Sequence, residues 1–354
     1  MLTYSGRLQD EELNKLPTPH PNLCLAIRNL MLNEVSSNID EESLEVKRFN
    51  DKIRLEIEFR DMRKRNPFRS VAGVDAGSQI LPLVSRRYAV ISALVYSMPS
   101  SSRFFLPPES FSFPYTHSNE KFNGIVNIRR EAKLYETARA FIAENASPQL
   151  VLIDGPLAFS NWWGIAGKKR DRHRLVTAVN RFLNLCKEEN IVVAGVVKRP
   201  SARYLVYHVG LKDETDLPDT FILLQSLRPG ERTGVFSPRL ALRRVIRAAP
   251  LMESIDCPIY SFYGRFSRDW FIPPLRIDLP AYSLSYLNEV ADYCYWSGFH
   301  NGVPLPIIRA DEEVRISKRF MGEIYSEIVS HVGQSMGEIS HIAPYWGEGG
   351  WMGV

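Results

Sequence analysis

The middle of this chain alternates between buried strands and amphipathic helices, and this alternation limits its fold more than any other feature. Residues 150–157 (LVLIDGPL) and 191–199 (IVVAGVVKR) are apolar runs that predict fully buried strands. The helix predicted between them, at about 171–189, has one apolar face, and another helix is predicted at about 127–145. Strands and helices in this order are typical of a layered α/β domain.

Two further strands are predicted ahead of this segment. SVAGVDAGSQ (70–79) is an apolar run that ends in an acid and a small-residue turn, and RYAVISALVYS (87–97) is β-branched and apolar. The two predict an antiparallel hairpin. Residues 98–124, rich in Ser, Pro and Phe, are expected to form a loop or an irregular edge.

The rest of the chain is less regular. Strands are predicted at 259–266 and, as an edge strand broken by prolines, at 272–280. Helices are predicted at 285–299 and from about Asp311 to Val332. The expected organisation is an N-terminal helical arm (1–67), a main domain (68–335) and a C-terminal tail (336–354).

The N-terminal arm is expected to contain one long, highly charged helix over 40–66, capped by Asp40 and ended by Pro67. Its apolar stripe is incomplete. Phe49, Ile53 and Phe59 could pack on this chain's own core or on another subunit, and the sequence leaves both readings open.

Composition excludes several classes of protein. The four cysteines are scattered without a CxxC pair, which argues against a zinc site of the usual spacing and against a disulfide scaffold. A net charge of +4 permits a polyanionic partner without requiring one. With no signal peptide and no run of roughly 18 apolar residues, a soluble cytoplasmic protein without a membrane partner is expected.

Acidic residues stand where apolar strands end or helices begin. Asp75 and Asp154 end strands, Glu131 lies in the first turns of a helix, and Asp311 begins the last helix. A lone buried carboxylate is costly, so such acids often bind a cation, although a turn cap or loop solvation is the more common explanation of any single one. Oxygen ligands favour Mn²⁺ or Mg²⁺, and two ions about 3.5–4 Å apart would suit phosphodiester hydrolysis.

A basic run follows the loop after Asp154. Basic side chains beside stacking aromatics suit a path for single-stranded nucleic acid, whereas a solvated helix start is the alternative. The candidates for nucleic-acid binding are Trp162, Trp163, Lys168, Lys169, Arg170, Arg172 and Arg174. Lys198, which closes a buried strand, is a candidate catalytic residue that could contact the scissile phosphate, or a lysine that reaches solvent.

An ordered set of motifs resembles the NurA nuclease family over most of residues 68–330. The motifs are GVDAGS (73–78), RREAKLYE (129–136), LIDGPL (152–157), VVKRP (196–200), LRPGERT (227–233), FYGRF (262–266) and GVPLPIIRADEEVRI (302–316). The resemblance implies a ribonuclease-H-like mixed sheet flanked by helices, and a manganese-favoured DNA nuclease with endonuclease and 5′-to-3′ exonuclease action. Carried over by motif, Asp75, Glu131 and Asp154 would bind the metal.

The resemblance also implies partners and a role. Family members form homodimers that dock on a hexameric HerA helicase-translocase and resect single-stranded and duplex DNA ends in double-strand break repair, which implies a nucleoid-associated protein. The chain departs from the family at Val303, where a tyrosine is usual, and at Asp311, where a histidine is usual and where the acid could bind metal instead. This departure leaves activity level and metal preference open.

Two other functions compete with the nuclease. One is a catalytically weak or inactive adaptor of a DNA translocase, and the other is an unrelated phosphatase or nucleotide hydrolase. The joint presence of Asp75, Glu131 and Asp154 favours the enzyme over the adaptor. The chain has no GxxxxGK[ST] run and no HExxH run, which excludes a P-loop ATPase and the common zinc hydrolases.

Overall fold

The computed structural model of the chain describes residues 20–116, 118–144, 147–159, 169–244, 250–335 and 343. The chain divides into two units, Met1–Phe49 and Asn50–Val354. The described part of the first unit is helical and belongs to α2 (Pro21–Glu56), which continues into the second unit. No helix within the described ranges combines the length and the apolar character needed to cross a membrane.

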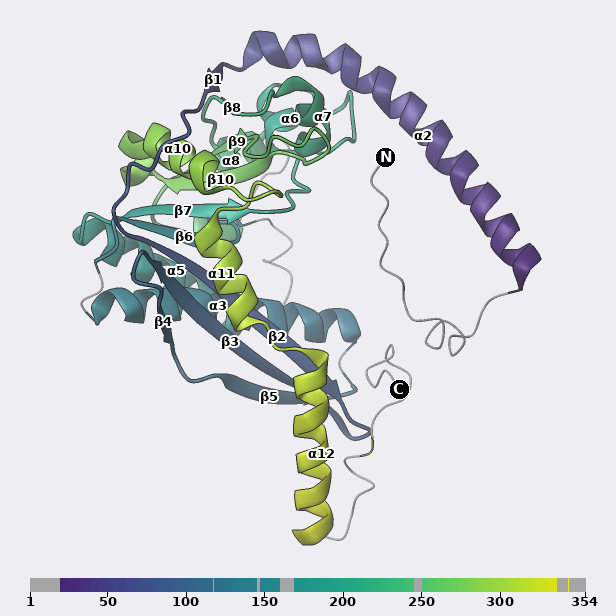
Figure 1. Cartoon of the computed structure of the whole chain (residues 1–354), viewed down its shortest axis with the longest axis vertical. Helices are drawn as coiled ribbons and strands as arrows, with labels where there is room; N and C mark the ends of the chain where they lie inside the picture. The colour runs from purple at the N-terminus through teal and green to yellow at the C-terminus, as the bar shows by residue number, and fades with distance from the viewer. Residues whose placement is uncertain are drawn as a thin grey trace. The chain divides into compact units, whose positions relative to one another are not determined.

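A mixed sheet of ten strands organises the second unit (Figure 1), in the order β1-β8-β9-β10-β7-β6-β2-β3-β4, with β5 also paired to β3. At its centre β2, β6 and β7 run parallel, and the remaining pairs are antiparallel. The strands are β1 (Phe59–Asp61), β2 (Val71–Pro82), β3 (Arg86–Met98), β4 (Ser102–Phe105), β5 (Glu109–Pro114), β6 (Leu150–Asp154), β7 (Val192–Val197), β8 (Glu231–Thr233), β9 (Ile259–Gly264) and β10 (Leu275–Pro280).

Helices cover both faces of the sheet. Among the described residues, the helices of the second unit are α3 (Asn119–Ala143), α5 (Lys169–Glu188), α6 (Tyr204–His208), α7 (Asp219–Ser226), α8 (Pro238–Arg243), α9 (Pro250–Glu253), the 3-10 helix η1 (Ala281–Tyr286), α10 (Leu287–Ser297), α11 (Leu305–Val314) and α12 (Lys318–Ser335). Along β3, Ile91 packs on Phe122 and Val126 of α3, whereas Ser92 donates a hydrogen bond to the carbonyl of Val314 in α11. Because successive strand residues point to opposite faces, α3 and α11 lie on opposite sides of the sheet.

Two glycines bring α11 unusually close to the sheet. A Cβ atom on Gly73 would lie 2.3 Å from the backbone carbonyl of Pro306, and one on Gly77 would lie 2.5 Å from the carbonyl oxygen of Val314. Residues 73, 75 and 77 share one face of β2. The two glycines therefore seat α11 directly over Asp75. Figure 1 shows α11 lying across the sheet at β2.

Most of the predicted elements are confirmed. The hairpin is β2 paired with β3, the buried strands are β6 and β7, and the helix between them is α5. The strand predicted at 259–266 is β9, and the helix predicted at 285–299 contains α10. These segments have long, regular apolar patterns, which explains why the sequence alone locates them.

Five predictions are wrong at the level of elements. Asp75 was expected to end a strand, but β2 continues to Pro82, so the small residues after Asp75 are part of the strand. The helix predicted over 40–66 begins at Pro21 and ends at Glu56, so Asp40 lies inside it and residues 59–61 form a strand. Residues 98–124 contain β4, β5 and the start of α3. The predicted edge strand is β10, which is fully buried between β9 and β7. The single last helix is two, α11 and α12, so Asp311 lies within a helix and does not begin one.

Candidate metal centre

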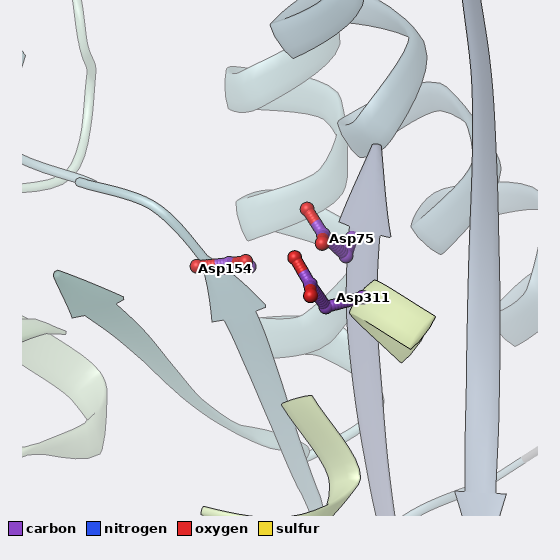
Figure 2. Close-up of side chains that lie close together, drawn as sticks. All are labelled: Asp75, Asp154 and Asp311. Carbon is purple, nitrogen blue, oxygen red and sulfur yellow. The ribbon is translucent and has the colours of Figure 1, made fainter. Parts of the chain in front are cut away.

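Three aspartates from distant parts of the chain meet above the centre of the sheet. Asp75 lies within β2, Asp154 is the last residue of β6, and Asp311 lies in α11. One carboxylate oxygen from each lies within 4.8 Å of the others. Figure 2 shows the three side chains converging on one space, two from neighbouring strands and one from the helix.

The fold explains why these acids meet. The parallel strands β2 and β6 pair Val74 with Ile153, which places the next residues, Asp75 and Asp154, side by side. The close approach of α11 at Gly73 then brings Asp311 over Asp75. Asp154 ends β6 at the carboxyl edge of the parallel strands, which is the usual ligand position of such folds, whereas β2 continues beyond Asp75 to Pro82.

Burial makes this cluster unfavourable as free carboxylates. Asp75 is 8% exposed, and burial raises its pKa to about 9, with the nearby charge of Asp154 adding to the effect. Burial likewise raises the pKa of Asp154, although the ammonium group of Lys198 opposes it. Negative charges that crowd together away from water need a counter-charge.

Glu131 adds a fourth carboxylate beside the cluster. It is buried in α3, burial raises its pKa, and its Oε1 accepts a hydrogen bond from Arg130 at 3.1 Å. Its Oε2 is buried and has no hydrogen-bond partner among the described residues. A Cβ atom on Gly155 would lie 3.6 Å from this oxygen, so the orphan oxygen faces the loop directly after Asp154.

Lys198 provides the nearest positive charge. Its Nζ lies 2.6 Å from Oδ2 of Asp154 and 3.4 Å from Oδ1 of Asp311. Burial alone would favour the neutral amine, but the carboxylates, Asp154 foremost, outweigh it and raise the pKa of Lys198. Arg130 pairs with Glu131 at 3.1 Å, and Arg315 pairs with Asp311 at 3.6 Å. These two cations and Lys198 still leave one negative charge in excess when all four acids are ionised.

These residues fit a divalent cation. Three converging carboxylates, with the unpartnered Oε2 of Glu131 next to them, form an all-oxygen donor set of the kind that Mg²⁺ and Mn²⁺ prefer. A buried polar atom without a partner is rare and is one sign of an ion site. Asp75, Asp154 and Asp311 are brought together, and Glu131 lies at their edge.

The candidates for nucleic-acid binding separate into three groups. Trp162, Trp163 and Lys168 lie outside the described residues. Lys169 and Arg170 are exposed at the start of α5, and Arg172 is half-buried. The guanidinium of Arg174 is half-buried and is held by ion pairs with Glu109 and Glu136, each at 2.6 Å, which ties α5 to α3 and β5.

A buried ion pair that the sequence reading missed anchors the loop after Asp154. Asp278 in β10 accepts hydrogen bonds from the backbone N–H groups of Leu157 (3.0 Å) and Ala158 (3.1 Å). Its partner is Arg276, whose Nε lies 2.8 Å from Oδ1 of Asp278. The sequence signal for this ion pair was an arginine and an aspartate within the apolar run LRIDLP. The prediction of an exposed edge strand accounted for both charges, so the pair was not recognised.

The chain is similar to known proteins in both sequence and fold. A sequence-family model described as the NurA domain matches residues 69–316, and no protein of curated function matches the chain. The crystal structure of the NurA nuclease from Sulfolobus solfataricus is similar, with 16% identity and a TM-score of 0.62, over 86% of this chain and 97% of that chain.

Two further solved structures are also similar. A NurA structure with manganese has 11% identity and a TM-score of 0.54, over 86% of this chain and 98% of its own. Another NurA structure has 10% identity and a TM-score of 0.55, over 92% of this chain and 100% of its own. At such identities the likeness concerns the fold, and it confirms the expected ribonuclease-H-like mixed sheet flanked by helices. Because the family match spans well over half of the sequence, the chain belongs to the NurA nuclease family.

Proposed function

We propose that this protein is a divalent-metal-dependent DNA nuclease that hydrolyses phosphodiester bonds, with endonuclease and 5′-to-3′ exonuclease action at single-stranded and duplex DNA ends. The observation that carries the proposal is the meeting of Asp75, Asp154 and Asp311 within 4.8 Å. Membership of the NurA family supports the nuclease class, and a similar structure that contains manganese supports the metal.

In this proposal the acids and the lysine divide the work. Asp75, Glu131, Asp154 and Asp311 would hold Mn²⁺ or Mg²⁺, and two such ions would supply an activated water and stabilise charge on the leaving oxygen. Asp154 and Asp311 hold the ammonium of Lys198 beside the cluster, where it can contact the scissile phosphate. Backbone N–H groups bound by Asp278 keep the loop after Asp154 in position.

The departures from the family pattern have specific consequences. Val303 is 3% exposed and packs in the main core with Ile307, so no hydroxyl is available at that position. Asp311 replaces the usual histidine and joins the carboxylate cluster. An anionic oxygen ligand in place of a neutral nitrogen favours harder cations, so Mg²⁺ should support activity better here than in relatives with histidine. An adaptor without catalysis would not need a metal-binding side chain at this position.

The proposed partners follow from the family. We also propose that the protein forms a homodimer and binds a HerA-type hexameric helicase-translocase. Its role would be end resection during double-strand break repair, in association with the nucleoid. This link rests on resemblance, because no described residue identifies a motor. Co-purification with a hexameric ATPase and faster cleavage when ATP is present would support it, and absence of both would remove the partner while leaving the nuclease.

The function is tested by plasmid nicking. Supercoiled plasmid is incubated with the protein in Mn²⁺, in Mg²⁺ or in EDTA, beside Asp75→Asn and Asp154→Asn variants. Metal-dependent nicking by the wild type and its loss in both variants, with the thermal transition retained, is the expected result. Nicking that survives EDTA or either substitution contradicts the proposal, and an inert wild type favours the adaptor.

A further inference from the structure

Tyr135 connects two of the proposed metal ligands. It lies in α3, four residues after Glu131, and residues at this spacing share one face of a helix. Its hydroxyl donates a hydrogen bond to the carbonyl of Pro156 at 3.1 Å, two residues beyond Asp154. The motif RREAKLYE (129–136) contains both residues of α3, but the proposed nuclease chemistry gives a role only to the glutamate.

Packing on two sides holds the ring of Tyr135. The side chain is fully buried, and its ring centroid lies 6.2 Å from that of Phe159 and 5.7 Å from that of Phe182 in α5. A phenylalanine would fill the same apolar space, and a buried hydroxyl is costly unless it forms a hydrogen bond. What the hydroxyl adds to the ring is therefore its bond to the loop after Asp154.

The carboxylate of Glu131 faces the same loop. Its Oε1 accepts a hydrogen bond from Arg130, whereas its buried Oε2 has no partner among the described residues. That oxygen faces Gly155, the residue directly before the carbonyl that Tyr135 binds. Helix α3 therefore meets this loop at two successive residues, with the unpartnered carboxylate oxygen at the first and the tyrosine hydroxyl at the second.

Glu131 approaches the cluster from a different side than the other acids. Asp75 and Asp311 lie on the face of the sheet that α11 covers, whereas Glu131 belongs to α3 on the opposite face. It meets the cluster past the end of β6, at the loop that Tyr135 holds. A shift of α3 against this loop would therefore move Glu131 relative to Asp154.

We propose that Tyr135 is a positioning residue, whose hydrogen bond to Pro156 sets the placement of Glu131 relative to Asp154 and so the geometry of the metal site. This inference rests on the proposed metal-dependent function and adds a residue that acts only through the ligands. Groups that orient metal ligands from outside typically change metal affinity by about 10- to 100-fold. Loss of the Tyr135 hydroxyl should therefore weaken metal binding although every ligand remains.

The test removes the hydroxyl and keeps the ring. Mn²⁺ is titrated calorimetrically into the full-length wild type and into Tyr135→Phe, and the electron paramagnetic resonance spectrum of the bound Mn²⁺ is recorded for each. The variant should bind Mn²⁺ about tenfold more weakly, and its spectrum should change because the arrangement of ligands changes. An unchanged affinity or an unchanged spectrum overturns the inference.

Tyr263→Phe is the matched control. Tyr263 is also fully buried, and its hydroxyl donates a hydrogen bond to Asp219 at 2.7 Å and not to the loop after Asp154. Each variant loses one buried hydrogen bond, so both should lower the melting temperature by a similar few degrees. Only Tyr135→Phe should weaken Mn²⁺ binding. Equal losses of affinity in the two variants would assign the effect to general loosening of the fold and overturn the inference.

A double variant tests whether Tyr135 acts through Glu131. In a Glu131→Gln background there is no carboxylate to position, so adding Tyr135→Phe should change Mn²⁺ affinity by less than about twofold. A further tenfold loss in that background contradicts the inference. A wild type that binds no Mn²⁺ overturns the metal centre and this inference together. An unchanged affinity in Tyr135→Phe, beside metal-dependent nicking of plasmid by the wild type, overturns the role of Tyr135 alone.

Discussion

Lys198 forms an ion pair with Asp154 in which Nζ lies 2.6 Å from Oδ2, directly beside two other aspartates. The same ammonium group lies 3.4 Å from Asp311. A lysine at the end of β7 thus links the end of β6 to α11. This arrangement gives Lys198 two separable effects, one on the charge of the acidic cluster and one on a phosphate placed there.

Replacing Lys198 with methionine separates these effects. Lys198→Met keeps the length of the side chain and removes the charge, so the acids should bind Mn²⁺ as tightly as before or more tightly. Cleavage should fall by about 100-fold, as for loss of one group that stabilises charge in the transition state. Mn²⁺ affinity from calorimetry and nicking rates provide the two readouts. Unchanged cleavage would mean that Lys198 contributes only a structural ion pair and does not act on the phosphate.

Gly73→Ala tests whether close approach of α11 builds the site. The added Cβ would meet the backbone carbonyl of Pro306 at 2.3 Å, so the helix must shift and carry Asp311 away from Asp75. We expect a loss of roughly 1–3 kcal/mol in unfolding free energy, as in other overpacked sites, together with weaker Mn²⁺ binding. Chemical denaturation and metal titration measure the two.

Gly322→Ala is the matched control for that substitution. Gly322 lies in α12, and a Cβ atom there would meet nothing within 4 Å. Alanine should be neutral or stabilise the helix by up to about 1 kcal/mol, with unchanged metal affinity. If Gly73→Ala behaves like Gly322→Ala, the tight seating of α11 is not what positions Asp311.

Local pattern was enough to predict the centre of the fold. The apolar runs of β6 and β7 and the amphipathic pattern of α5 are long and regular, and each is found as predicted. The wrong predictions concern segments whose secondary structure depends on contacts with distant parts of the chain. Residues 59–61 form a strand because they pair with β8, far along the chain, and β10 is central despite its prolines because β9 and β7 enclose it.

The residues of the candidate site also divide into those that local sequence pattern reveals and those that only tertiary packing brings together. Asp75 and Asp154 were named because each follows an apolar run, but only Asp154 ends its strand, and Asp75 lies within β2. Asp311 was placed at a helix start, and its position in the cluster depends on the close packing of α11 on Gly73, which spacing alone does not reveal. Arg276 and Asp278 were missed because a buried ion pair inside an apolar strand resembles an exposed edge in sequence.

The basic run that begins at Lys168 should contribute to DNA affinity, and two of its members, Lys169 and Arg170, are exposed at the start of α5. Replacing Lys168, Lys169 and Arg170 with alanine should weaken binding and reduce the salt slope by about one unit per lost phosphate contact. Arg174→Ala is a contrasting variant, because Arg174 is held by Glu109 and Glu136 and its loss should lower stability instead. Fluorescence anisotropy across a salt series measures the slope. An unchanged slope in the triple variant would make the run a solvated helix start.

A homodimer is expected from the apolar surface of α2. Within the first unit, Ile27 and Leu30 are 50% and 71% exposed, and they share one side of the helix. Light scattering should give twice the chain mass of 40.5 kDa, and Ile27→Glu with Leu30→Glu should shift it towards the monomer. Leu240→Glu, on α8, is the control and should leave the mass unchanged. A monomeric wild type at high micromolar concentration refutes the dimer.

The central claim is that Asp75, Asp154 and Asp311 together bind the metal that cleaves DNA. A crystal soaked in Mn²⁺, with data collected at the manganese absorption edge, tests it most directly. The account predicts anomalous peaks at bonding distance from oxygens of all three aspartates, with Oε2 of Glu131 in the same site, and no peak in an Asp154→Asn crystal treated alike. Manganese bound elsewhere, or a cluster that stays metal-free while the same protein nicks DNA in Mn²⁺, would contradict it.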